Sequence, residues 1–115
     1  MARILLRNYW GSEYEVTLRL NHYAQNNNLY IGIDCWEDED GDKLMYPEPY
    51  GDLTVNLGIK CKDTCAFVDT NNNPGIERWL AENKLAKPTG RVAPSGFCVY
   101  PEYEFNMDEV QKYVE

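Results

Sequence analysis

One stretch of the chain, Phe67–Leu85 (FVDTNNNPGIERWLAENKL), constrains the fold most strongly. An apolar strand end enters an Asn-rich turn there, and a loop with Pro and Gly follows the stretch. Between these two, apolar residues recur at i, i+3 and i+4, which gives one stripe over about two helical turns: Ile76, Trp79 and Leu80. We therefore expect a short helix over about residues 74–84, with Asn73 as its N-cap and Pro74 at its first position.

Alternation of apolar and polar residues predicts two strands with a half-buried face, Glu13–Leu20 and Leu29–Trp36. Shorter runs predict further strands or strand ends: Ala2–Arg7, Lys43–Tyr46, Asp52–Gly58, Cys65–Val68 and Phe97–Phe105. Because proline lacks the N–H that a ladder needs, Pro47-Glu48-Pro49 is expected to end a strand and Pro101 to lie near an edge or a bulge. Residues 87–96 are expected to form loops.

The strands come early and the helices late, which is typical of an α+β fold with an antiparallel sheet. We expect one α+β domain over residues 1–115, because this length supports one modest core. About five to six strands would form the sheet, and the helix over residues 74–84 would cover one of its faces. A short helix over about residues 107–114, capped by Asn106 or Asp108, would end the chain.

The net charge of −8 comes from two acidic segments. Residues 34–52 hold eight acids and one lysine, and residues 101–115 hold five acids and one lysine, while the other segments are weakly positive. This balance argues against direct binding to a nucleic-acid backbone, which requires Lys and Arg. It suits binding to a basic surface of another protein.

The most pronounced charged feature is the run Glu37–Asp42, in which Asp-Gly predicts a hairpin tip. Two interpretations stay open. The run is a solvated tip that protects a sheet edge, or its carboxylates mimic phosphates and occupy a basic nucleic-acid groove on a partner protein. Under the second interpretation Tyr30 is a further candidate anchor, and the partner-binding residues are Trp36, Glu37, Asp38, Glu39, Asp40, Asp42 and Tyr46.

An alternative candidate site would bind a small molecule or a nucleotide around Trp79. It would use the Asn-rich turn and the loop that follows the helix, through five residues: Asp69, Asn71, Asn73, Arg91 and Ser95. No nucleophile–base set and no Gly-rich phosphate loop is recognisable, so we expect no enzyme and no cofactor. The CxxxC pair of Cys61 and Cys65 lacks the second pair that a zinc site uses, so we expect no metal.

The sequence has neither a secretory signal pattern nor an apolar run of the roughly 20 residues that cross a bilayer. We therefore expect a cytoplasmic protein without membrane contact. Disulfides are rare in that compartment, so the four cysteines are expected to be free thiols.

Three segments resemble a family of small bacterial proteins of unknown function, DUF4313: LTVNL (53–57), AFVDTNNNPGIERWLAENKLAKPTGR (66–91) and SGFCVYPEYEFN (95–106). The first 50 residues resemble it only as strand, loop and strand. The resemblance implies a small cytoplasmic protein, often carried by conjugative elements and phages, with no known activity. Small acidic proteins of mobile elements often inhibit host defence. By that analogy we expect a non-enzymatic inhibitor of the anti-CRISPR or anti-restriction type that acts by DNA mimicry.

Overall fold

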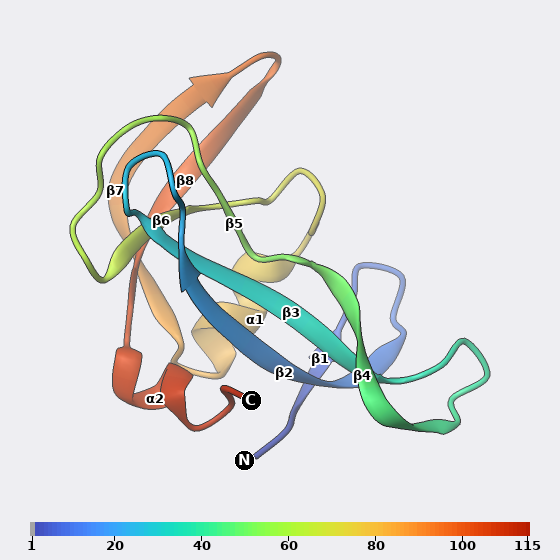
Figure 1. Cartoon of the computed structure of the whole chain (residues 1–115). Coiled ribbons are helices and arrows are strands. Elements are labelled where there is room, and N and C mark those ends of the chain that lie inside the picture. Colours follow the sequence, from blue (N-terminus) through green and yellow to red (C-terminus); the bar gives the residue numbers. More distant parts are fainter. Residues whose placement is uncertain (1) are drawn as a thin grey trace.

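In residues 2–115, which a computed structural model describes, the backbone forms eight strands and two short helices (Figure 1). The first antiparallel sheet has the order β1-β2-β3-β4: β1 (Ile4–Arg7), β2 (Glu13–His22), β3 (Leu29–Glu37) and β4 (Lys43–Asp52). The second has the order β5-β6-β8-β7: β5 (Thr54–Val55), β6 (Cys65–Val68), β7 (Ala86–Ser95) and β8 (Cys98–Phe105). The helices are α1 (Ile76–Glu82) and α2 (Met107–Gln111). The α+β class is confirmed, but two four-stranded sheets replace the single sheet that we expected.

The extra sheet arises where β4 continues into β5. The N–H of Leu53 donates to the carbonyl of Ile31 on β3, and the carbonyl of Leu53 accepts from the N–H of Asp69 beyond β6, each at 2.9 Å. Leu53 is fully buried, so one residue ties the two sheets together at their junction.

The expectation that Pro47-Glu48-Pro49 ends a strand is wrong, because these residues lie inside β4. β4 is the edge strand of the first sheet, and its pairing with β3 has two register shifts. An edge strand tolerates proline because one side of its backbone has no ladder partner. The predicted strand Asp52–Gly58 shortens to β5, which pairs with only two residues of β6.

The predicted loop over residues 87–96 is also wrong, because this segment belongs mostly to β7. A register shift between Pro88 and Val92 accommodates Gly90, whose φ is +93°. Glycine adopts this left-handed region without steric cost. Pro101 pairs with Val92 beside that shift, as we expected of a proline near a bulge. Beyond it, β7 and β8 extend as a two-stranded ribbon that projects from the body of the molecule (Figure 1).

Both sheets and α1 share one core. The predicted stripe of α1 is confirmed, because Ile76, Trp79 and Leu80 are all buried in it. The indole N–H of Trp79 donates to the carbonyl of Leu5 on β1 at 2.8 Å. This hydrogen bond satisfies the polar atom of a buried aromatic side chain and fixes α1 against the first sheet.

α1 is shorter than expected and is capped differently. Its N-cap is Gly75, with a φ of +83°, and not Asn73. The side-chain amide of Asn73 instead donates to the carbonyls of Asp52 and Asp69, at 2.8 and 3.0 Å. Asn73 therefore secures the turn before the helix. Within residues 2–115 no helix is long and apolar enough to cross a membrane.

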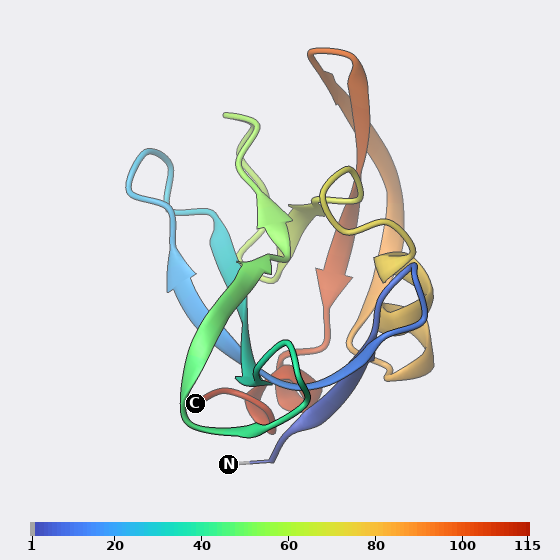
Figure 2. The same ribbon diagram turned by 90° about the vertical axis from the view of Figure 1, so that its right-hand side faces the viewer.

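The last residues of the chain pair with β2 of the first sheet. Asn106 caps α2, as predicted, by accepting the N–H of Glu109 at 3.4 Å. α2 ends at Gln111, and the chain then runs beside β2, where Leu18 accepts from the N–H of Glu115 at 3.2 Å and donates to the carbonyl of Tyr113 at 2.8 Å. The described ends of the chain therefore lie at the same end of the molecule (Figure 2).

Candidate functional site

The acidic run forms the tip of the β3–β4 hairpin. The carboxylate of Asp38 accepts the backbone N–H groups of Asp40 and Asp42, both at 2.9 Å, and Gly41 has a φ of +82°. Asp38 therefore shapes the turn, as Asx side chains commonly do. Glu39, Asp40 and Asp42 are exposed and project from this fixed tip.

Lys43 neutralises two carboxylates at the base of the hairpin. Its Nζ lies 2.7 Å from Oε1 of Glu37 and 3.3 Å from Oε1 of Glu15 on β2. The hydrogen bond to Glu37, followed by that to Glu15, raises the pKa of Lys43. Hydrogen bonds from Arg3 and Lys43 lower the pKa of Glu15. Glu37 was predicted to bind a partner, but its carboxylate is paired with Lys43 within the first sheet, and its side chain is only 13% exposed.

The aromatic residues predicted beside the acids separate into buried and exposed ones. Trp36 is buried, its indole N–H donates to the hydroxyl of Thr17 at 3.0 Å, and the guanidinium of Arg3 lies 4.0 Å from its ring centre. Trp36 thus belongs to the interior and not to the partner-facing surface where we expected it. Tyr46 is 78% exposed on β4, and Tyr30 is half-buried.

Sequence reasoning missed three exposed apolar residues at this end of the first sheet. Met45 is 87% exposed beside Tyr46, and Tyr9 and Trp10 are 71% and 76% exposed in the β1–β2 turn. The rings of Tyr9 and Trp10 meet edge to face, 5.6 Å apart. Because β1 to β4 are antiparallel, the β1–β2 and β3–β4 turns lie at the same end of the sheet. The sequence signal for the exposure of Tyr9 and Trp10 is their place directly before Gly11-Ser12 in a turn, because turn residues face solvent.

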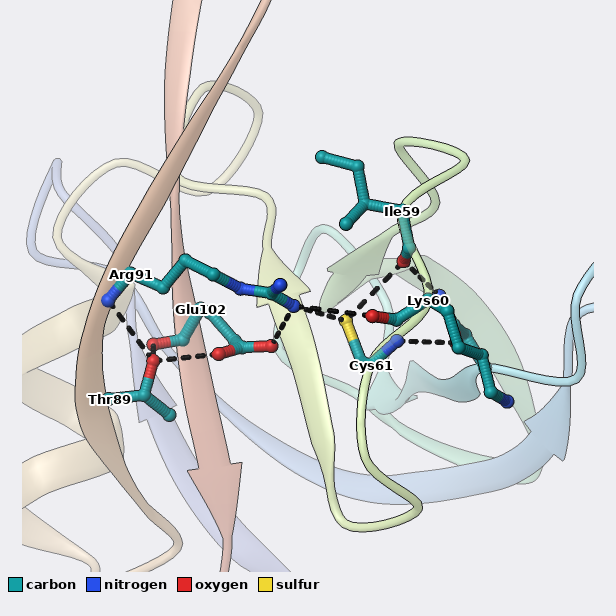
Figure 3. Close-up of polar contacts among 7 residues, drawn as sticks. Ile59, Lys60, Cys61, Thr89, Arg91 and Glu102 are labelled. Carbon is teal, nitrogen blue, oxygen red and sulfur yellow. Dashed lines mark hydrogen bonds and ion pairs between the residues drawn. The ribbon is translucent and has the colours of Figure 1, made fainter.

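A second polar cluster joins β7, β8 and the loop before β6 (Figure 3). Nη2 of Arg91 lies 2.6 Å from Oε2 of Glu102, 3.5 Å from Sγ of Cys61 and 3.4 Å from the carbonyl of Lys60. The hydroxyl of Thr89 donates to Oε1 of Glu102 at 2.8 Å. The buried Glu102 carboxylate therefore has partners on both oxygens.

The electrostatics of this cluster favour a structural role. Burial raises the pKa of Glu102, but hydrogen bonds from Arg91, Thr89 and Cys61 outweigh it and lower that pKa overall. Burial, followed by the hydrogen bond to Glu102, raises the pKa of the Cys61 thiol to about 11. A thiol in this state is a poor nucleophile, because the thiolate is the reactive form.

The alternative ligand site does not assemble as predicted. Asn73, Trp79 and Arg91 line three different hollows. Both oxygens of Asp69 accept hydrogen bonds from Asn72, at 3.1 and 2.8 Å, so its carboxylate secures the turn. The remaining two residues lie at the exposed turn and at the tip of the β7–β8 ribbon: Asn71 and Ser95. Arg91 lies in a groove that three lysines also line: Lys60, Lys62 and Lys87.

The four cysteines are free in the structure. Among residues 2–115, no three His, Cys, Asp or Glu side chains are grouped so that they could hold a metal ion.

Comparison with known proteins identifies a family but no function. No curated protein and no solved structure matches the chain. A family model with the description "Domain of unknown function (DUF4313)" matches residues 17–115. The match begins within β2 and covers β3 and β4, which the resembling segments do not reach. It includes the acidic hairpin and the polar cluster around Arg91. The chain therefore belongs to the DUF4313 family.

Proposed function

We propose that the protein is a non-enzymatic binding module that uses the β3–β4 hairpin to bind a basic surface of another protein. The observation that carries this proposal is the juxtaposition on one hairpin of exposed carboxylates and exposed large apolar side chains: Glu39, Asp40, Asp42, Met45 and Tyr46. Met and Tyr are enriched in protein interfaces, where carboxylates steer a basic partner and apolar side chains supply affinity.

The rigidity of the hairpin supports the proposal. Asp38 fixes the turn from inside, and Lys43 holds the base through Glu37 and Glu15. A tip that is already ordered loses little conformational entropy when it binds. The internal pairing of Glu37 and the turn bonds of Asp38 leave Glu39, Asp40 and Asp42 as the carboxylates for a partner.

The partner that we propose is a nucleic-acid-handling protein of host defence, which the chain would inhibit by occupying a basic groove. Two arguments support this choice. Exposed carboxylates on a projecting tip are complementary to a groove that evolved for phosphates. Asp38 also orders the turn that carries these carboxylates, so the tip presents them together without rearrangement.

The test compares two triple variants with equal net charge. One reverses the tip (Glu39→Lys, Asp40→Lys, Asp42→Lys) and leaves Asp38 in place, because Asp38 holds the turn. The other reverses three exposed acids elsewhere (Asp63→Lys, Glu104→Lys, Asp108→Lys). A host protein that binds wild type and the second variant, but not the first, would support the proposal if salt weakens its binding and double-stranded DNA competes for it.

The apolar contribution is tested with Met45→Ala and Tyr46→Ala against that captured protein. We expect each to weaken binding by about 1 kcal/mol or more, because large side chains near carboxylates commonly act as anchors. Unchanged capture by the tip-reversed variant would overturn the proposed site. Binding that DNA leaves untouched would overturn the proposed class of partner.

A further inference from the structure

The basic residues of this acidic chain fall into two groups. Within residues 2–115, seven of the eleven have a carboxylate oxygen within 4.0 Å: Arg3, Arg7, Arg19, Lys43, Arg78, Arg91 and Lys112. The other four are Lys60, Lys62, Lys84 and Lys87. All four line two adjoining grooves on the second sheet, and these grooves share Lys87, Pro88 and Glu104.

The first groove contains most of this charge. It has a volume of about 560 Å³, and its charged lining consists of four cations and two carboxylates: Lys60, Lys62, Lys87, Arg91, Glu102 and Glu104. Arg91 and Glu102 form an ion pair and neutralise each other. The remaining charges of the groove are three lysines and the carboxylate of Glu104. This hollow is therefore net positive on a protein with a net charge of −8, and its local field favours an anion.

Arg91, Glu102, Thr89 and Lys60 belong to the lining of this groove, and their polar contacts connect them to one another (Figure 3). Nη2 of Arg91 is held by Glu102 and by the carbonyl of Lys60, so the guanidinium is oriented, yet its side chain is 45% exposed. Lys60 is partly engaged, because its Nζ donates to the carbonyl of Asn26 at 3.0 Å. Lys62 and Lys87 are exposed, and in the described chain their ammonium groups have no hydrogen-bond partner.

We propose that this groove binds a small ligand that carries two or more phosphate groups. Its volume falls in the range of small-ligand sites, about 300–1,000 Å³. Lysine binds phosphate as a point charge, and several lysines in one hollow match a ligand with several negative charges. The groove lies on the second sheet, whereas the acidic hairpin belongs to the first, so this site goes beyond the proposed function and does not depend on it.

Glu104, an acidic residue in the same groove, tests whether the groove prefers anions or cations. It is exposed, lies in the same groove and pairs in register with Lys87 across β7 and β8. Its carboxylate opposes an anion and attracts a cation. Neutralising Glu104 should therefore strengthen binding of a phosphate ligand, whereas neutralising Lys62 and Lys87 should weaken it.

The experiment titrates the wild-type protein with inorganic tripolyphosphate, with ATP and with adenosine, by calorimetry and by amide chemical shifts. We expect binding of tripolyphosphate and ATP, none of adenosine, and shifts that centre on Lys62, Lys87 and Arg91. Lys62→Gln with Lys87→Gln should weaken binding at least about tenfold, or about 1.4 kcal/mol. Glu104→Gln should tighten it, and Lys112→Gln, a lysine paired elsewhere, should leave it unchanged.

Each contrary result overturns the proposal. Wild-type protein that binds no tripolyphosphate at millimolar concentration shows that the groove is not a phosphate site. Equal weakening by Lys112→Gln shows that only the net charge of the protein matters. If a single-stranded oligonucleotide displaces tripolyphosphate far better than ATP does, the groove serves a nucleic acid and not a small ligand. Thermal unfolding of every variant, all of which change exposed side chains, checks that the fold is intact.

Discussion

Arg91 on β7 and Glu102 on β8 form an ion pair with Nη2 and Oε2 only 2.6 Å apart, and one partner is buried while the other is partly exposed. The side chain of Glu102 is 8% exposed, and the side chain of Arg91 is 45% exposed. A buried carboxylate is unfavourable unless both of its oxygens have partners. Arg91 supplies one and Thr89 supplies the other, so the pair fixes β7 to β8 where the register shifts.

This pair should make the stability of the protein sensitive to acid. Because its hydrogen bonds hold the folded pKa of Glu102 below the ordinary value of 4.5, the folded state binds a proton less readily than the unfolded state. The stabilisation is therefore fully present above about pH 4.5 and is lost as the pH falls through the folded pKa. We expect Glu102→Gln to lower the free energy of unfolding by about 1–2 kcal/mol at neutral pH, and the difference from wild type to shrink in acid.

Urea unfolding at a series of pH values measures this difference. Glu104→Gln is the matched control, because Glu104 lies two residues away on the same strand but is exposed. Its difference from wild type should be small and should change little with pH. A Glu102→Gln difference that stays constant into acid would contradict the linkage to the Glu102 carboxylate.

A second prediction concerns Gly32 on β3. A Cβ atom at this position would lie 2.5 Å from Nη2 of Arg19 and 2.5 Å from the hydroxyl oxygen of Tyr30. Both atoms belong to a network, because Arg19 pairs with the buried Asp34 and Tyr30 donates to Asp52 at 2.6 Å. Gly32→Ala should therefore disrupt that network and lower the free energy of unfolding by about 1–3 kcal/mol.

Gly51→Ala is the control for that change. Gly51 also lies in a paired strand, but a Cβ atom there would meet only the side-chain oxygen of Asn73, at 3.9 Å. Chemical denaturation should show little loss for this variant. Equal losses in both variants would contradict the crowding of Arg19 and Tyr30 as the cause of the effect.

The sequence predicts those strands and helices in which the spacing of apolar residues matches the side chains that are buried. Alternation identifies β2 and β3, and helical spacing identifies the buried face of α1. It fails where tertiary context overrides local preference: β4 accepts Pro47 because it is an edge strand, and β7 accepts Gly90 because a register shift surrounds it. The acidic tip was visible as a continuous run, but the burial of Trp36 was not, since it depends on Thr17 and Arg3 from other strands.

The lysine-lined groove could not be predicted because its residues are far apart in sequence. Lys60 and Lys62 precede β6, whereas Lys87 lies on β7, and only the pairing of both strands with β8 brings them together. The composition shows that the central segment of this acidic chain is weakly positive, but it does not show which of its lysines lie close together. Arg91 was recognised as a candidate ligand residue, although the residues grouped with it were not the ones that surround it.

A third prediction concerns the thiols. Burial raises the pKa of Cys61 to about 11, and burial also raises that of Cys65, so few of these side chains are thiolates near neutral pH. Cys98 is more exposed, at the start of β8. A thiol reagent should therefore label Cys98 rapidly, and Cys61 and Cys65 slowly. Mass spectrometry of wild type and Cys98→Ser measures the rates, and rapid labelling of Cys61 in the folded protein would contradict this order.

The last prediction concerns Thr17, a fully buried polar residue in the middle of β2. Its hydroxyl accepts the indole N–H of Trp36 at 3.0 Å and donates to Oε2 of Glu115 at 2.7 Å. Thr17→Val keeps the shape of the side chain but leaves the buried indole without an acceptor. We expect the free energy of unfolding to fall by about 1–3 kcal/mol, because an unpaired buried donor costs about this much.

A double-mutant cycle with Trp36→Phe separates this hydrogen bond from packing. Phenylalanine has no N–H to satisfy, so Thr17→Val should cost clearly less in the Trp36→Phe background than in wild type. We expect a coupling of about 1 kcal/mol between the two residues, which contacting pairs in one network commonly show. Equal costs in both backgrounds, measured by chemical denaturation, would show that Thr17 acts through Glu115 or through packing, and not through the indole of Trp36.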